Sequence, residues 1–101
     1  MNIILGSEPA DKLRDNYTVL ELETFTKQDG SSVTAYCVLD LVPLSEMAQL
    51  ESNKLLHESF IREYNNKNYK FCEDAVEHLI GKFNGELDTF YIEILKRIKT
   101  V

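Results

Sequence analysis

The chain has 101 residues, of which 44% are hydrophobic, and a net charge of −6 at pH 7. This length is enough for one hydrophobic core and too short for two, so we expect a single globular domain over residues 1–101. The acidic balance argues against nucleic acid and anionic membranes as direct partners, because phosphate binding depends on lysine and arginine. Residues 1–51 hold nine acidic and three basic residues, whereas residues 52–101 hold eight of each. The charge is compatible with a basic protein as a partner, and the other interpretation is that it serves solubility alone.

The apolar runs are all too short to span a bilayer, and the first residues lack the basic and apolar regions of a signal peptide. We therefore expect a cytoplasmic protein. Cys37 and Cys72 fall on apolar faces of predicted elements, which favours reduced core thiols. Small size, acidity and the lack of a catalytic motif are typical of accessory or regulatory proteins of bacteria and phages. The sequence indicates no cofactor.

The first predicted element is a short strand over residues 2–5, an apolar run closed by Gly6 that suits burial on both faces. Ser7 is placed to cap a short helix that continues to about Asp15. The 11 residues between Leu5 and Tyr17 are close to the minimum for a crossover between parallel strands. We therefore expect the first strand to lie parallel to a strand of the element that follows.

That element is a β-hairpin over residues 17–42 that turns at Asp29-Gly30. Asp-Gly favours a two-residue type I′ turn, which places Gln28 opposite Ser31. In this register one face is almost wholly apolar, and it consists of Leu20, Leu22, Thr24, Val33, Ala35, Cys37 and Leu39. The opposite face is mixed, with the pairs Val19–Asp40, Glu21–Val38, Glu23–Tyr36 and Phe25–Thr34.

Helical spacing begins after Pro43. Residues 44–65 fit one long helix, but its apolar stripe drifts, so the helix is either continuous or broken near Ser52-Asn53. Residues 65–68 predict a tight turn. An amphipathic helix follows over residues 69–83, ended by Asn84-Gly85, and the last helix covers about residues 87–99.

Together these elements predict an α+β fold with the order β-α-β-β-α-α-α. In it, a small three-stranded sheet is made of the short N-terminal strand and the antiparallel hairpin. The C-terminal run of three helices packs on the apolar face of that sheet, where Leu20, Leu22, Cys37 and Leu39 form the floor of the core.

Two sets of residues have the chemistry of a metal or acid-base site. Asp74, Glu77 and His78 lie within one turn of a helix and could hold a divalent ion, but their phase points away from the apolar stripe and favours a solvated polar face. His57 lies in the middle of an apolar stripe, where it is either a general base or a hydrogen-bonded core residue. His57 has no nucleophile beside it in the sequence, and the phase of the other set favours a solvated face, so we assign no catalytic residue and no metal ligand.

The mixed face of the hairpin is the best candidate for binding, since it combines acids with exposed aromatic and aliphatic groups. Its residues are Glu21, Glu23, Phe25, Tyr36, Val38 and Asp40. The first hypothesis is a noncatalytic protein-binding or regulatory module whose partner is a protein of basic character or a second copy. The alternative is an acidic inhibitor that presents Glu21, Glu23 and Asp40 to a nucleic-acid-processing enzyme. A third is a small metal-binding or enzymatic domain centred on His57 or on Asp74, Glu77 and His78. An ordinary solvated sheet face would carry no function.

Overall fold

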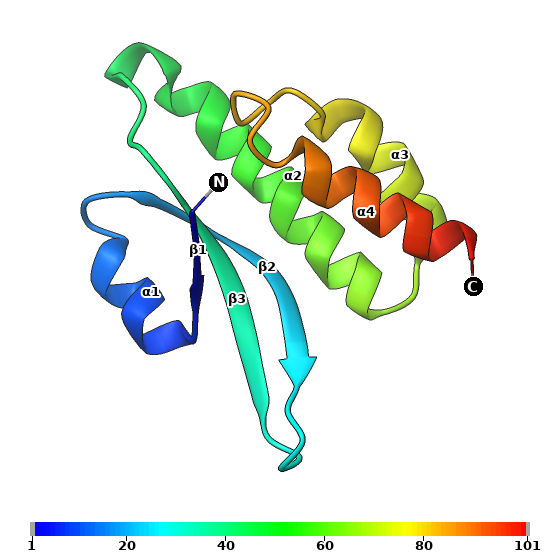
Figure 1. Cartoon of the computed structure of the whole chain (residues 1–101). Coiled ribbons are helices and arrows are strands. Elements are labelled where there is room, and N and C mark those ends of the chain that lie inside the picture. Colours follow the sequence, from blue (N-terminus) through cyan, green and yellow to red (C-terminus); the bar gives the residue numbers. More distant parts are fainter. Residues whose placement is uncertain (1, 101) are drawn as a thin grey trace. The chain divides into compact units, whose positions relative to one another are not determined.

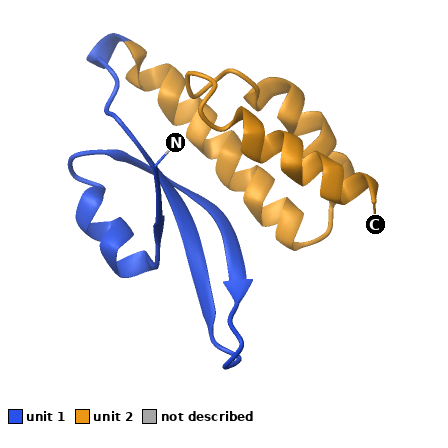
Figure 2. Cartoon of the chain, viewed as in Figure 1, with its two compact units in different colours: residues 1–45 blue, residues 46–101 orange. Residues whose placement is uncertain are grey.

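The computed structural model describes residues 2–100 and has the predicted α+β element order (Figure 1). The elements are β1 (Asn2–Leu5), α1 (Ser7–Leu13), β2 (Thr18–Thr26), β3 (Ser32–Leu39), a 3-10 turn (Leu44–Glu46), α2 (Met47–Asn65), α3 (Tyr69–Leu79) and α4 (Asp88–Lys99). The chain forms two compact units, Met1–Ser45 and Glu46–Val101 (Figure 2). A single domain with the helices packed on the sheet stays a prediction.

The sheet has the order β1-β3-β2, and both pairings are antiparallel. Because β1 and β2 are each antiparallel to β3, they run in the same direction, as the crossover length predicts. They are not neighbours, however, since β3 lies between them (Figure 1). The short crossover through α1 thus spans the width of one strand, and β1 and β2 form the two edges of the sheet.

The hairpin turns at the predicted place, but the two-residue type I′ turn is wrong. The Gly30 N–H donates to the Lys27 carbonyl at 3.0 Å, and the Lys27 N–H donates to the Ser31 carbonyl at 2.7 Å. Gly30 has φ 89°, whereas Asp29 lacks the positive φ that a type I′ turn requires. This is a three-residue loop with glycine in the left-handed position. The Asp29 carboxylate accepts hydrogen bonds from the Ser31 hydroxyl and amide, at 2.6 and 2.9 Å, which stabilises this loop.

The longer loop changes the register of the hairpin. Near the turn, Phe25 lies opposite Val33, one position away from the expected partner. A β-bulge between positions 21 and 23 then shifts the register a second time, so that Leu20 lies opposite Cys37. Two shifts of one residue restore the original alternation, so Leu20 and Cys37 share a face as predicted. Between the bulge and the turn, each side chain of β2 therefore lies on the side of the sheet opposite to the predicted one.

Helix α1 packs on one face of the sheet and forms the core of the first unit. Ala10 of this helix is fully buried and forms a cluster with Val19 and Tyr36 of the sheet. Three partly buried residues pack against this cluster: Ile4, Leu13 and Val38. The predicted serine cap is wrong, because Gly6 with φ 96° occupies the N-cap and its N–H donates to the Thr34 carbonyl at 2.9 Å.

Helix α2 is continuous through Ser52 and Asn53, which decides between the two sequence alternatives. The drift of the stripe arises because the first apolar residues of this segment do not belong to the core. Leu44 and Met47 are exposed, whereas the buried residues of α2 are Asn53, His57, Phe60 and Ile61.

Helix α3 ends at Leu79, four residues earlier than predicted. The next residue has an extended ψ of 129°, and Gly81 follows with φ 81°. The Gly81 N–H donates to a carboxylate oxygen of Asp88 at 2.8 Å, which ties this loop to the start of α4. Phe83 is nevertheless buried, so the amphipathic pattern correctly predicted its burial while overextending the helix. In the second unit α2 packs on α3 and α3 packs on α4.

Candidate interaction surface

The centre of the predicted binding face is covered by α1. Tyr36 is only 7% exposed and Val38 is partly buried, both within the cluster around Ala10. The Arg14 guanidinium lies over the Tyr36 ring, 5.8 Å from its centroid. The expectation that Tyr36 and Val38 lie on an open sheet face is therefore wrong. A short helix with a narrow apolar stripe suffices to cover them, because the small side chain of Ala10 allows close approach.

The bulge in β2 separates the remaining residues of the predicted face. Glu21 lies opposite Tyr36 and so shares the α1 side of the sheet, whereas Glu23 and Phe25 lie opposite Ala35 and Val33 on the other side. Asp40 follows the end of β3. The six residues therefore do not share one face, and the three acids do not form the common patch that an acidic inhibitor would need. Their roles in binding stay predictions.

The structure draws attention instead to β1, which the sequence suggested was buried on both faces. Burial on both faces is wrong, because Ile3 and Leu5 are 54% and 58% exposed. The cause is the strand order, which places β1 at an edge of the sheet. Residues 2–5 carry no charged side chain. An uncharged, apolar edge strand is a template for pairing with another strand.

The backbone N–H and C=O groups of Ile3 and Leu5 also point to this open edge. In an antiparallel pair, hydrogen-bonded and non-hydrogen-bonded pairs alternate along the strands. The bond from the Gly6 N–H to the Thr34 carbonyl makes this pair a hydrogen-bonded one. The alternation then directs the N–H and C=O groups of Ile4 toward β3, and those of Ile3 and Leu5 away from it.

The side chains of β1 divide in the same way. Ile4 packs against the α1 cluster and anchors the strand. Ile3 and Leu5 lie opposite Cys37 and Ala35, on the face of the sheet away from α1. Each of these two residues therefore combines an exposed apolar side chain with outward backbone donors and acceptors.

The opposite edge, β2, has features that hinder strand addition. It contains the β-bulge, and the acidic side chains of Glu21 and Glu23 flank that bulge. Bulges and charged residues are the usual means by which proteins block an edge strand. Phe25, which is 45% exposed, lies beyond the bulge toward the turn.

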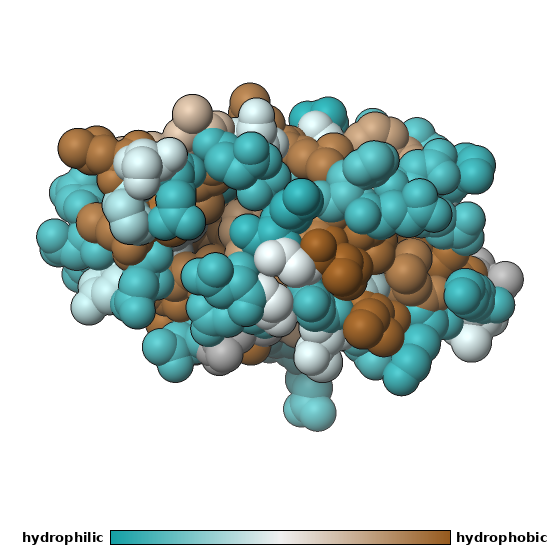
Figure 3. All heavy atoms as spheres, turned by 90° about the horizontal axis from the view of Figure 1, so that it is seen from above, coloured by the Kyte–Doolittle hydropathy of each residue, from teal (hydrophilic) through white to brown (hydrophobic). Residues whose placement is uncertain are grey.

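Several other exposed apolar side chains lie outside the strands. Figure 3 shows one face of the molecule, on which hydrophobic side chains lie among hydrophilic ones. Leu55 and Ile92 are exposed on helices, and Leu41 and Leu44 lie in the segment between β3 and α2. Single exposed apolar residues are common on protein surfaces, so these carry little information.

His57 is a hydrogen-bonded core residue. It is fully buried, and its Nδ1 atom lies 2.7 Å from the hydroxyl of Tyr91, which is also fully buried. Aromatic rings of α2, α4 and the loop before α4 surround the imidazole: the centroids of Phe60, Phe83 and Phe90 lie 6.0–6.4 Å from its own. This arrangement joins α2 to α4, and its lack of solvent exposure does not suit a general base acting on a substrate.

The three candidate metal ligands on α3 are exposed, and they do not converge on one point. Asp74 instead accepts a hydrogen bond from the Lys70 ammonium at 3.1 Å, and this contact raises the pKa of Lys70. Within residues 2–100 no group of three histidine, cysteine, aspartate or glutamate side chains is placed to hold a metal ion.

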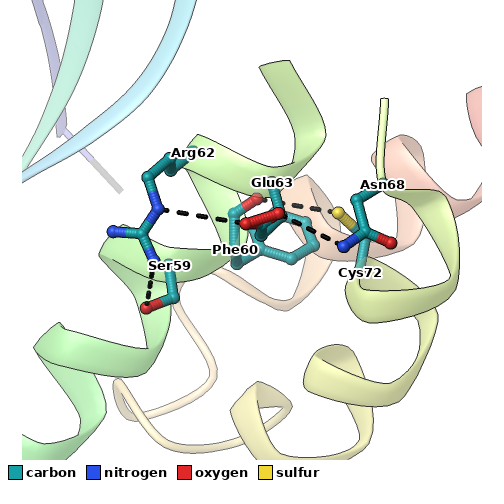
Figure 4. Close-up of polar contacts among 6 residues, drawn as sticks. All are labelled: Ser59, Phe60, Arg62, Glu63, Asn68 and Cys72. Carbon is teal, nitrogen blue, oxygen red and sulfur yellow. Dashed lines mark hydrogen bonds and ion pairs between the residues drawn. The ribbon is translucent and has the colours of Figure 1, made fainter. Parts of the chain in front are cut away.

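Cys72 is buried where α3 follows α2 (Figure 4). Its thiol donates to the Phe60 carbonyl at 3.6 Å, and the nearby Asn68 amide donates to Glu63 at 3.2 Å. Burial, followed by the charges of Glu63 and Glu73, raises the pKa of the Cys72 thiol to about 11. The thiol is therefore protonated near neutral pH and has the properties of a packing residue.

Comparisons with protein-family models, curated proteins and solved structures find no match to this chain. Within the part of the chain that the structure describes, no helix is both long enough and apolar enough to cross a membrane.

Proposed function

We propose that this chain is a noncatalytic protein-binding module that receives an extended segment of a partner along the open edge of β1. The observation that carries the proposal is the coincidence, at Ile3 and Leu5, of exposed apolar side chains with outward backbone groups. Strand addition uses both elements, since main-chain hydrogen bonds give affinity and alternate side chains give specificity.

The surroundings of β1 favour a preformed site. Ile4 holds the strand against the α1 cluster, and the pairing with β3 fixes the direction of the outward groups. A partner strand would therefore add to an ordered template, which lowers the entropic cost of association. The opposite edge offers less, because its bulge interrupts the backbone pattern and two acidic side chains flank the bulge.

A noncatalytic role is supported by the burial and contacts of the residues that could otherwise act in catalysis. His57 and Cys72 are buried and hydrogen-bonded. Asp74 is engaged with Lys70 on an exposed helix surface. General acid-base or nucleophilic catalysis needs such groups at a site that a substrate can reach.

Photo-crosslinking in cells of the native host tests this proposal. A photoreactive phenylalanine analogue replaces Leu5 in one variant and Phe25, on the opposite edge strand, in a matched control. Both positions are about half exposed, 58% and 45%, so the probe itself should be equally accessible. We expect protein adducts from position 5 and few from position 25, and loss of the former when Ile3→Lys is added. The absence of adducts from position 5 would overturn the proposal.

A further inference from the structure

We propose that the segment received by β1 is the β1 strand of a second copy of this chain, so that two sheets join edge to edge. This inference rests on the proposed function and names the partner. It starts from the two outward residues, Ile3 and Leu5, and from the fact that β1 is itself an exposed, extended and uncharged strand.

The positions of the outward groups allow a symmetric pairing. In an antiparallel arrangement with its twofold axis at Ile4, Ile3 lies opposite Leu5 of the partner subunit, and Leu5 lies opposite Ile3 of the partner subunit. Both are positions whose N–H and C=O groups point outward, so each pair exchanges two hydrogen bonds. The same patch thus serves both subunits, as a closed two-fold interface requires. The product is a continuous six-stranded sheet.

The side chains that meet in this arrangement are compatible. Apolar side chains of Ile3 and Leu5 face each other across the new strand pair, on the sheet side away from α1. On the other side Ile4 meets Ile4 of the partner subunit. Opposed apolar groups stabilise antiparallel pairs, whereas like charges directly opposite one another destabilise them. Pairing of two β2 edges would bring acidic residues together, which favours β1 as the self-association edge.

Sedimentation velocity of the purified full-length chain tests this inference over a concentration series up to about 0.5 mM, because small interfaces associate weakly. We expect the mass to rise from 11.7 kDa toward twice that value with concentration. Ile3→Lys should stay monomeric throughout, because it places two lysines at the joined edge. Phe25→Lys, an equally drastic change on the opposite edge strand, should dimerise like the wild type.

A wild-type chain that stays at 11.7 kDa at every concentration overturns the inference without reference to any variant. Equal dimerisation of Ile3→Lys and wild type also overturns it. If Ile3→Lys does not fold, as judged by circular dichroism, Leu5→Lys supplies the same test at the other outward residue.

The outcome can be separated from that of the proposed function. A monomeric chain whose position 5 crosslinks to a different protein refutes the second-copy inference and supports the binding module. A crosslink between two copies supports both. A monomeric chain with no adduct from position 5 refutes both.

Discussion

Replacement of Tyr36 by alanine should remove a large part of the stability of the first unit. The side chain is 7% exposed and packs with Ala10 and Val19, beneath the guanidinium of Arg14. A buried aromatic side chain covers roughly 150–250 Å², which at about 25 cal/mol per Å² corresponds to about 4–6 kcal/mol. Measured costs of replacing a buried aromatic residue by alanine are about 3–5 kcal/mol. We therefore expect a loss of about 4 kcal/mol in the free energy of unfolding.

Urea unfolding followed by far-ultraviolet circular dichroism measures this loss, and Phe25→Ala is the matched control. Phe25 is an aromatic residue of the same hairpin but is 45% exposed, so its replacement should cost less than about 1 kcal/mol. A Tyr36→Ala variant within about 1 kcal/mol of the wild type, which is below the range for buried aromatic residues, would refute the packing of α1 over this face. Equal losses in the two variants would refute the contrast in burial between Tyr36 and Phe25.

Three further expectations concern single side chains. Tyr91→Phe removes the hydroxyl that lies 2.7 Å from His57 in the buried core, and we expect urea unfolding to show a loss of about 1–3 kcal/mol; a neutral effect would contradict this hydrogen bond. The pKa of Cys72 is raised to about 11. The buried thiol therefore contributes fully to the free energy of unfolding below pH 9.0, and this contribution is lost as the pH rises through about 11. At pH 8 its thiol should therefore react with a disulfide reagent far more slowly than after denaturation, as peptide mapping would show, and equal rates would contradict burial. Hydrogen bonds from Ser31 lower the pKa of Asp29, so the carboxylate stabilises the turn fully above pH 3.8 and loses this effect as the pH falls through its folded-state pKa. An NMR titration of Asp29 should have its midpoint below 3.8, and a midpoint at or above that value would refute the interaction.

The element order and the position of the hairpin turn could be predicted from local sequence, because Asp29-Gly30 and the apolar periodicities are local signals. The turn type could not, since Asp-Gly suits both a two-residue loop and a three-residue loop with glycine last. The hydrogen bonds that the Ser31 amide and hydroxyl donate to the Asp29 carboxylate favour the latter. No glycine or other residue near Leu22 signals the bulge in the sequence. Its effect is to return Leu20 and Cys37 to the same face of the sheet.

The candidate site depended on information that is not local. An apolar run such as residues 2–5 reads the same whether the strand is central or at an edge, and only the strand order distinguishes the two. The apolar stripe of α1 consists of little more than Ala10 and Leu13, and so narrow a stripe did not predict that this helix covers Tyr36. A predicted three-stranded sheet always leaves two edge strands, however, and the uncharged one could have been singled out by the contrast between residues 2–5 and the acidic β2.

Amide hydrogen exchange at β1 tests the binding edge most directly. NMR on the isotope-labelled chain would compare dilute solution with high concentration and with extract of the native host. The Ile4 N–H, which points toward β3, should be protected in every condition. We expect the N–H groups of Ile3 and Leu5 to exchange rapidly in dilute solution and to become protected at high concentration or in extract. Protection of these two groups already in dilute solution, or rapid exchange in every condition, would contradict an edge that pairs with a partner strand.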